Sequence, residues 1–183
     1  MKMTTPIKDD IKLSELLDVY DEYSKNQLLL KYCLNTGLRI SDVLSQKVGP
    51  NTTSQYIEMN EKKTGKSKTI SLSNQLKRYI DTYVKINELS SDDYLFFNSR
   101  DKSKHISRQM AHKIISNAGE MVGLDISAHS LRKTFGYRAY KQGVDLSLLM
   151  DIFNHSNQSV TLKYIGITQD NINTVYESMN IGF

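Results

Sequence analysis

The spacing of apolar residues predicts a mainly helical chain. Apolar side chains recur with the period of a helix that buries one face over most of the sequence. Residues 26–35 are apolar on nearly every side, which predicts a buried helix ended by Gly37. The first predicted helix carries Ser14 near its start. Helices are expected at residues 13–23, 26–35, 40–46, 75–86, 107–122, 130–142, 145–153, 160–165 and 169–179.

The period changes to two in the second quarter of the chain. Residues 55–59 and 68–72 alternate like strands and flank a polar loop that contains Gly65. They predict an antiparallel hairpin with Lys63 near its tip. Residues 94–97 form a short apolar run that fits either a third strand or a buried connector. The predicted fold class is therefore α+β and mainly α-helical, with a small antiparallel β-sheet.

Composition favours a single globular domain over residues 1–183. Hydrophobic residues make up 39% of the chain, which is enough for a core, and two prolines with nine glycines argue against disorder. The formal net charge of +4 is compatible with binding nucleic acid, but it also fits an ordinary protein with surplus surface lysines.

The single cysteine, Cys33, lies in an apolar run and has no second cysteine to pair with, so a buried, inert thiol is expected. No apolar run is long enough to span a membrane, and the first residues lack the apolar stretch of a secretion signal. These features predict a cytoplasmic protein.

Six polar residues spread along the chain carry the candidate chemistry. They supply two guanidiniums, one ammonium, two imidazoles and one phenol, which suits attack on a phosphodiester by a tyrosine without a metal or another cofactor. No dense cluster of Asp, Glu and His is visible, which disfavours a metal-dependent nuclease. The six residues are Arg39, Lys63, His129, Arg132, His155 and Tyr164.

Arg39 follows the helix-ending Gly37 at the start of the next predicted helix, where helix N-terminal amides favour an anion. Asp42 lies three residues further on and fits two interpretations: a salt bridge to Arg39, or a first-turn aspartate that favours the helix dipole. In isolation, an exposed surface role for Arg39 is the more common alternative.

His129 and Arg132 are three residues apart, so on one helix they share a face. Ser127 or Ser130 could cap that helix. Lys133 points elsewhere and is expected to be solvated or to contact a DNA backbone.

The lysine and the tyrosine each have competitors. Lys63 shares the hairpin tip with three other lysines, any of which could contact DNA or solvate a turn; these are Lys62, Lys66 and Lys68. Tyr164 is one of eleven tyrosines and is singled out by His155, nine residues earlier. One straight helix would place those two on opposite sides, so the polar residues 156–159 are expected to interrupt it.

The strings around these residues resemble the catalytic signature of the tyrosine recombinases, the phage integrase family. They are Thr36-Gly37-Leu38-Arg39-Ile40-Ser41-Asp42, Lys62-Lys63-Thr64-Gly65-Lys66, His129-Ser130-Leu131-Arg132, and Asn154-His155 with Tyr164 nine residues later. The resemblance covers residues 14–176 and favours Lys63 as the lysine before Thr-Gly. Two departures are Asp42, where many members carry Glu, and Asn154, where most carry glycine.

The resemblance implies an enzyme that cleaves and rejoins double-stranded DNA in site-specific recombination. Tyr164 would form a 3′-phosphotyrosyl link, with Lys63 as the acid and Arg39 and Arg132 holding the phosphate. It implies a monomer in isolation and a homotetramer on DNA. Members usually carry a core-binding domain before this one; none is expected here, which predicts weak, salt-sensitive DNA binding.

Other functions stay open from the sequence. A topoisomerase could relax DNA by the same chemistry, and a non-catalytic DNA-binding regulator could retain the fold. The final predicted helix has an apolar stripe, which could dock on a neighbouring protomer, as in relatives, or pack on its own core; the stripe consists of Ile172, Val175, Tyr176 and Met179.

Overall fold

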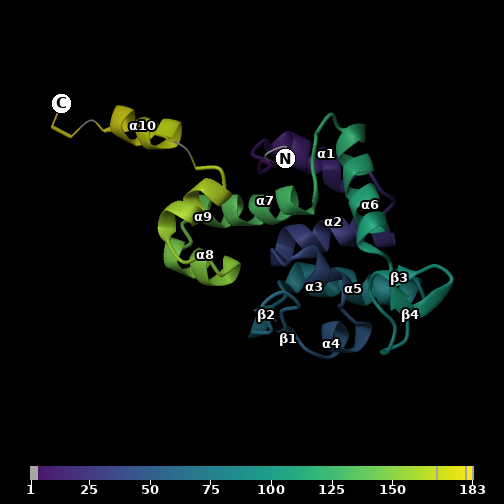
Figure 1. The fold of residues 1–183 in the computed structure, drawn as a ribbon. Coiled ribbons are helices and arrows are strands. Elements are labelled where there is room, and N and C mark those ends of the chain that lie inside the picture. Colours follow the sequence, from purple (N-terminus) through teal and green to yellow (C-terminus); the bar gives the residue numbers. More distant parts are fainter. Residues whose placement is uncertain (1–3, 168, 180, 183) are drawn as a thin grey trace.

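The computed structural model describes residues 4–167, 169–179 and 181–182, with the backbone alone at positions 169, 170 and 172. Helices surround one main core, and two small antiparallel sheets lie at its edge (Figure 1). In chain order the elements are α1 (Asp10–Leu17), α2 (Lys25–Thr36), α3 (Ile40–Leu44), α4 (Val48–Thr53), β1 (Tyr56–Asn60), β2 (Ser67–Ser71), α5 (Asn74–Ile86), β3 (Phe97–Asn98), β4 (Asp101–His105), α6 (Arg108–Met121), α7 (Ala128–Lys141), α8 (Leu146–Phe153), α9 (Gln158–Tyr164) and α10 (Gln169–Ser178).

Most predicted elements are confirmed, and their ends follow capping chemistry. Ser24 accepts a hydrogen bond from the Gln27 amide at the start of α2, and Gly37 ends that helix in the left-handed region with φ 59°. The predicted hairpin pairs β1 with β2, with Ile57 opposite Ile70. The α+β, mainly helical fold class is therefore correct.

The first helix differs from its prediction at both ends. It begins after Asp9, whose carboxylate accepts from the amides of Ile11 and Lys12, so Ser14 lies within the helix instead of near its start. It stops at Leu17, eight residues long. Tyr20 then reaches the core from a turn and donates its hydroxyl to the Ile114 carbonyl at 2.7 Å.

Two elements, α4 and β4, were not predicted. The segment containing Gly49 and Pro50 forms α4, where buried Asn51 accepts the Tyr32 hydroxyl at 2.8 Å. The apolar run at residues 94–97 is mainly a buried connector, because Leu95 and Phe96 are fully buried, and only Phe97 enters a strand. That strand pairs with β4, whose mostly polar residues gave no strand pattern.

The main core is built around α2, whose Leu28, Leu29 and Leu30 are fully buried. Cys33 lies beside them, 2% exposed and free, and burial raises the pKa of its thiol to about 12. The thiol is therefore the inert one that the sequence predicts.

A second, smaller cluster joins α7, α8 and α9 around Leu149, Phe153 and Ile165. Gly136 of α7 makes this packing possible, because a Cβ atom there would lie 2.6 Å from the Phe153 ring and 2.7 Å from Ile165. The two clusters meet along α7.

Helix α10 projects away from the rest of the molecule beyond α9 (Figure 1). Val175 and Tyr176 of this helix and Met179, directly after it, are more than half exposed, so they do not pack on the chain's own core; the side chain of Ile172 lies outside the described residues. Across the described part of the chain, no helix has the length and apolar character needed to cross a membrane.

Candidate active site

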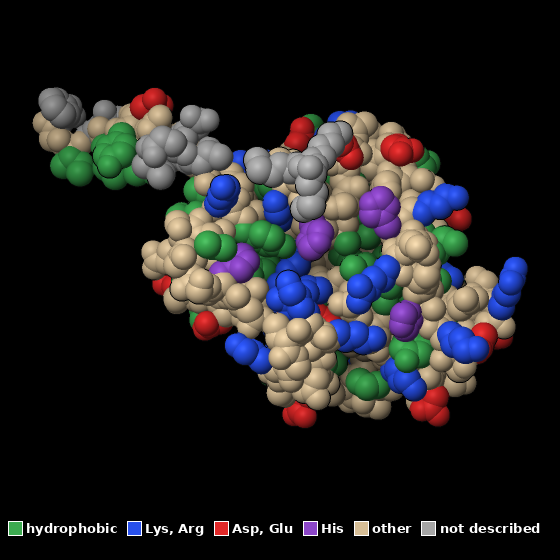
Figure 2. All heavy atoms as spheres, viewed as in Figure 1, with side chains coloured by type: hydrophobic (Ala, Val, Ile, Leu, Met, Phe, Trp, Pro, Cys, Tyr) green, Lys and Arg blue, Asp and Glu red, His purple; other side chains and the backbone are tan. Residues whose placement is uncertain are grey.

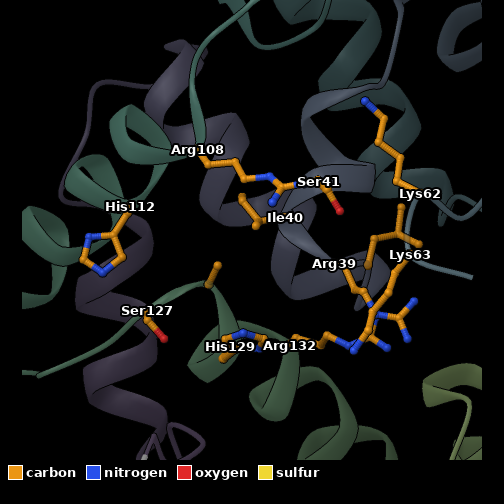
Figure 3. A pocket seen from close by; sticks show the side chains of 12 residues that line it. Arg39, Ile40, Ser41, Lys62, Lys63, Arg108, His112, Ser127, His129 and Arg132 are labelled. Carbon is orange, nitrogen blue, oxygen red and sulfur yellow. The ribbon is translucent and has the colours of Figure 1, made fainter. Parts of the chain in front are cut away.

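A cavity of about 570 Å³ opens between α3, the β1–β2 loop, α6 and the start of α7. Lys and Arg side chains gather near the middle of this face, with histidines around them (Figure 2). Arg39, Lys63 and Arg132 lie at one end of the cavity, and His112 and Ser127 lie at the other (Figure 3). The cavity is lined by Leu38, Arg39, Ile40, Ser41, Lys62, Lys63, Arg108, His112, Ser127, Ala128, His129 and Arg132.

Arg39 sits at the N-cap of α3, where the left-handed turn at Gly37 directs the chain from α2 into the new helix. Its Nη1 lies 2.9 Å from Oε2 of Glu61, and its side chain is 20% exposed. Of the two interpretations of Asp42, the structure fits the aspartate in the first turn of α3 and not the salt bridge to Arg39. Asp42 is fully buried and instead accepts the backbone amide of Lys62 at 3.0 Å, which holds the hairpin against α3.

Arg132 is the most enclosed cation of the site, 4% exposed in the middle of α7. Its Nη1 donates to the Gly37 carbonyl, and its guanidinium carbon lies 4.9 Å from the centre of the Phe153 ring. It also interacts electrostatically with the Tyr164 phenol. Burial lowers the pKa of Arg132, while Tyr164 acts to raise it. The guanidinium therefore joins the main core to the α8–α9 segment.

His129 lies in the first turn of α7, three residues before Arg132. It is part of the helix because α7 begins at Ala128, two residues earlier than predicted. Ser127 is the N-cap residue, and its amide donates to the Ser130 hydroxyl at 3.1 Å. Burial lowers the pKa of His129, and the charges of Arg132, Lys133, Lys63 and Arg39 lower it further.

Lys63 lies in the exposed loop between β1 and β2 and points toward the Arg39 side of the cavity (Figure 3). Lys62 lines the same cavity. Lys68 is directed elsewhere, since its Nζ donates to the Ile152 carbonyl at 2.8 Å. Lys66 lies across the hairpin, facing Asp151 and Asn154 in a separate depression.

His155 and Tyr164 meet because the chain reverses between α8 and α9. Asn154 ends α8 in the left-handed region, with φ 57° and ψ 48°, and Asn157 caps α9 by accepting the Val160 amide. An interruption is therefore confirmed, but it lies at residues 154–157 instead of 156–159, because Gln158 and Ser159 already belong to α9. The two rings approach edge to face with centroids 5.0 Å apart, and Nδ1 of His155 lies 3.0 Å from the Thr161 hydroxyl.

Tyr164 is the last residue of α9, and its ring packs against Phe153 with centroids 5.1 Å apart. Burial raises the pKa of the Tyr164 phenol above its ordinary value of 10.0, while Arg132 and Arg39 act to lower it. The phenol therefore faces a cationic site whose charge favours its ionised form once burial is overcome.

Lys133 is not fully solvated, which was one of the two roles expected for it; the other, a contact to a DNA backbone, stays a prediction. Its Nζ donates to the Thr4 carbonyl at 2.6 Å and lies 5.2 Å from the centre of the Tyr164 ring. It thereby adds a further cation next to the phenol, and burial lowers the pKa of its ammonium group.

The structure brings all six predicted residues into one region. Arg39, Lys63, His129 and Arg132 line the cavity, while His155 and Tyr164 join it through Arg132. Such a site can bind a tetrahedral anion between two guanidiniums, beside a phenol and an ammonium. Among the described residues, no group of three or more His, Cys, Asp or Glu side chains could hold a metal ion.

Sequence reasoning missed Glu61, a carboxylate that is 2% exposed beside Arg39. The available signal was a lone acid next to Lys62 and Lys63 in a strongly basic loop. Arg108 and His112, one turn apart on α6, were also missed because nothing in the sequence links them to the other cations.

Comparisons with known proteins show the family of the chain. The model of the phage integrase family matches residues 9–170. A probable integrase/recombinase, YoeC of Bacillus subtilis, is 34% identical over 179 residues, 97% of either protein. The tyrosine recombinase XerA of Pyrococcus horikoshii is 26% identical over 95% of this chain, which spans 60% of that protein.

Solved structures show the same fold. The XerH site-specific recombinase, bound to its palindromic difH substrate in a post-cleavage complex, superposes with a TM-score of 0.74 at 21% identity. The match covers 97% of this chain and 54% of XerH.

Proposed function

The chain belongs to the phage integrase family of tyrosine recombinases, and on this premise we propose that it breaks and rejoins DNA with Tyr164 as the nucleophile. The sequence relatives are named as integrases and recombinases, which favours recombination over DNA relaxation or a purely regulatory role. The partner is double-stranded DNA.

The proposed cleavage is a balanced transfer of one phosphodiester. The Tyr164 oxygen bonds to phosphorus as the bond to the 5′ oxygen breaks, which leaves a 3′-phosphotyrosyl link. His129 takes the phenol proton, and Lys63 gives a proton to the departing 5′ oxygen. Arg39 and Arg132 hold the non-bridging oxygens, and His155 hydrogen-bonds to the phosphate. A partner strand's 5′ hydroxyl reverses these steps, so no ATP is needed.

One observation carries the proposal more than any other. Arg132 is held by the Gly37 carbonyl, contacts the Tyr164 phenol and lines the cavity with Arg39. A phosphate bound between the two guanidiniums would therefore lie next to the phenol. Proximity of this kind turns a slow encounter into an intramolecular attack.

Assembly and location are further parts of the proposal. We place the reaction in the cytoplasm, where reducing conditions suit the free thiol of Cys33. We propose that four copies act on two duplexes, with a monomer in isolation. The exposed Val175 and Tyr176 of α10, with Met179 directly after it, give each copy an apolar face for a neighbour.

The test uses a nicked suicide duplex that traps the covalent adduct. Tyr164→Phe should abolish the adduct while leaving DNA affinity within about twofold, since only the hydroxyl is lost. Tyr56→Phe is the matched control, because Tyr56 is 64% exposed on β1 and should leave adduct formation unchanged. An adduct that persists in Tyr164→Phe would assign the nucleophile to another residue.

A further inference from the structure

Glu61 is a buried carboxylate at the start of the loop that carries Lys63. Its side chain is 2% exposed, and its backbone closes the loop through bonds to Gly65 and Lys66. Glu61 is the residue directly after β1, so the sheet fixes where its side chain begins. The carboxylate is buried in the protein, whereas the two lysines that follow it, Lys62 and Lys63, are exposed.

Three segments of the candidate site converge on one oxygen of this carboxylate. Oε2 lies 2.9 Å from Arg39 Nη1, accepts the Thr64 hydroxyl at 2.7 Å, and accepts the Asn154 amide at 2.9 Å. These partners belong to the start of α3, the loop of Lys63, and the turn before His155, respectively. Glu61 therefore contacts Arg39 itself and the sequence neighbours of two other proposed catalytic residues, Lys63 and His155.

Lys68 reinforces the connection from the second strand. Its Nζ lies 3.8 Å from Oε1 of Glu61 and donates to the Ile152 carbonyl in α8. The hairpin is thus tied to the α8–α9 segment by two polar links, one through Asn154 and one through Lys68.

The environment keeps this carboxylate charged. Burial acts to raise the pKa of Glu61, but the hydrogen bond from Thr64 and the guanidinium of Arg39 outweigh it, so the pKa lies below its ordinary value. A buried charge is tolerated only when its partners hold it in a well-defined geometry. Removing the charge would therefore release several partners at once.

We propose that Glu61 is a positioning residue for the cleavage reaction, holding Arg39, the Lys63 loop and the His155 turn in register. The inference rests on the proposed function, because register matters only if these groups act on one phosphate. An arginine has five N–H donors, so pairing at Nη1 leaves donors for the phosphate. Glu61 orients the guanidinium without touching the substrate.

The experiment measures the rate constant and the final amplitude of adduct formation on the suicide duplex. Glu61→Gln keeps the shape of the side chain but loses its charge, and it should slow cleavage by about 100-fold at full amplitude, the scale of a misplacement of about 1 Å. Glu58→Gln is the matched control, since Glu58 is exposed on the same strand. It should cleave at the wild-type rate.

A second substrate separates the two positioning effects. With sulfur in place of the departing 5′ oxygen, no acid is needed, so Glu61→Gln should recover in part and keep the defect that comes from Arg39. Thr64→Val disturbs only the loop and should recover almost fully. Thr64→Val also tests the role of Glu61 if Glu61→Gln fails to fold, because it removes one of the hydrogen bonds to that carboxylate.

Three results would overturn the inference. The first is a wild-type rate of adduct formation in Glu61→Gln. The second is a reduced amplitude at an unchanged rate in Glu61→Gln, which indicates a smaller folded fraction. The third is equal slowing of Thr64→Val on both substrates. Failure of Tyr164→Phe to abolish the adduct would instead overturn the proposed function, whatever Glu61 does.

Discussion

Asn154 illustrates how one backbone conformation places two side chains. It adopts φ 57° at the end of α8, which directs the chain so that His155 faces Tyr164. Asn tolerates the left-handed region better than other residues with a Cβ, so it can stand where most relatives carry glycine. Its amide adds a bond to Glu61 that glycine could not make.

Asn154 substitutions should separate the turn from the hydrogen bond. Asn154→Ala loses both, whereas Asn154→Gly loses only the bond and keeps the left-handed turn. We expect Asn154→Ala to unfold with a free energy lower by about 1 kcal/mol than Asn154→Gly, the cost of a left-handed alanine. Urea unfolding followed by circular dichroism measures this, and equal stabilities would show that the turn carries no strain.

At the scale of elements, the β1–β2 hairpin places its four lysines in different surroundings. Lys62 and Lys63 face the cavity, Lys68 is held by the Ile152 carbonyl, and Lys66 lies in the depression beside Asp151. Pairing across a two-stranded sheet fixes this order, because the loop has little freedom once Glu61 and Gly65 are bonded. The structure therefore reduces the candidates for the general acid from four lysines to the two that line the cavity, Lys62 and Lys63.

Replacing Lys63 should remove the acid but not the nucleophile. Lys63→Ala is expected to slow cleavage of normal DNA by about 100-fold or more, the usual contribution of a general acid. A substrate with sulfur at the departing 5′ position should restore the rate. Lys66→Ala is the matched control and should remain within a few-fold of wild type on either substrate. Failure of the sulfur to restore Lys63→Ala would move the acid to a neighbouring lysine.

The elements were largely predictable, while their contacts were not. Period located α5 and the hairpin, because each buries one regular face, whereas α2 was located by its apolar residues on nearly every side and by the glycine that ends it. Helix α4 escaped because Gly49-Pro50-Asn51 has the composition of a turn. The sequence left the partner of Arg39 open and did not indicate Glu61, because only tertiary packing brings that carboxylate beside the guanidinium from another element.

The whole molecule presents one basic cavity on a surface of mixed charge. Five cations line it, namely Arg39, Lys62, Lys63, Arg108 and Arg132. They come from α3, the hairpin, α6 and α7, so the fold concentrates a modest net charge of +4 at one place. Charge focused in a concave site raises the local potential for a phosphate backbone.

DNA binding should therefore weaken steeply with salt. If these five cations contact phosphates, the logarithm of the binding constant should fall with the logarithm of salt concentration with a slope of about −4. Fluorescence anisotropy of a labelled duplex, in the Tyr164→Phe background, measures the slope between about 50 and 200 mM salt.

Two variants control this measurement. Arg108→Ala should reduce the slope by about 1, because one phosphate contact is lost. Lys85→Ala, exposed on α5 and outside the cavity, should leave it unchanged. A slope near zero would show that the cavity does not bind the DNA backbone.

Cys33 can serve as a probe of how often the main core opens. It is the only cysteine, and it lies at 2% exposure among the leucines of α2. A thiol-specific reagent in water can reach it only when that core opens, so the labelling rate reports the opening equilibrium and not the chemistry of the cavity. A variant that cleaves slowly but labels like wild type has lost alignment, whereas one that labels faster has lost its core.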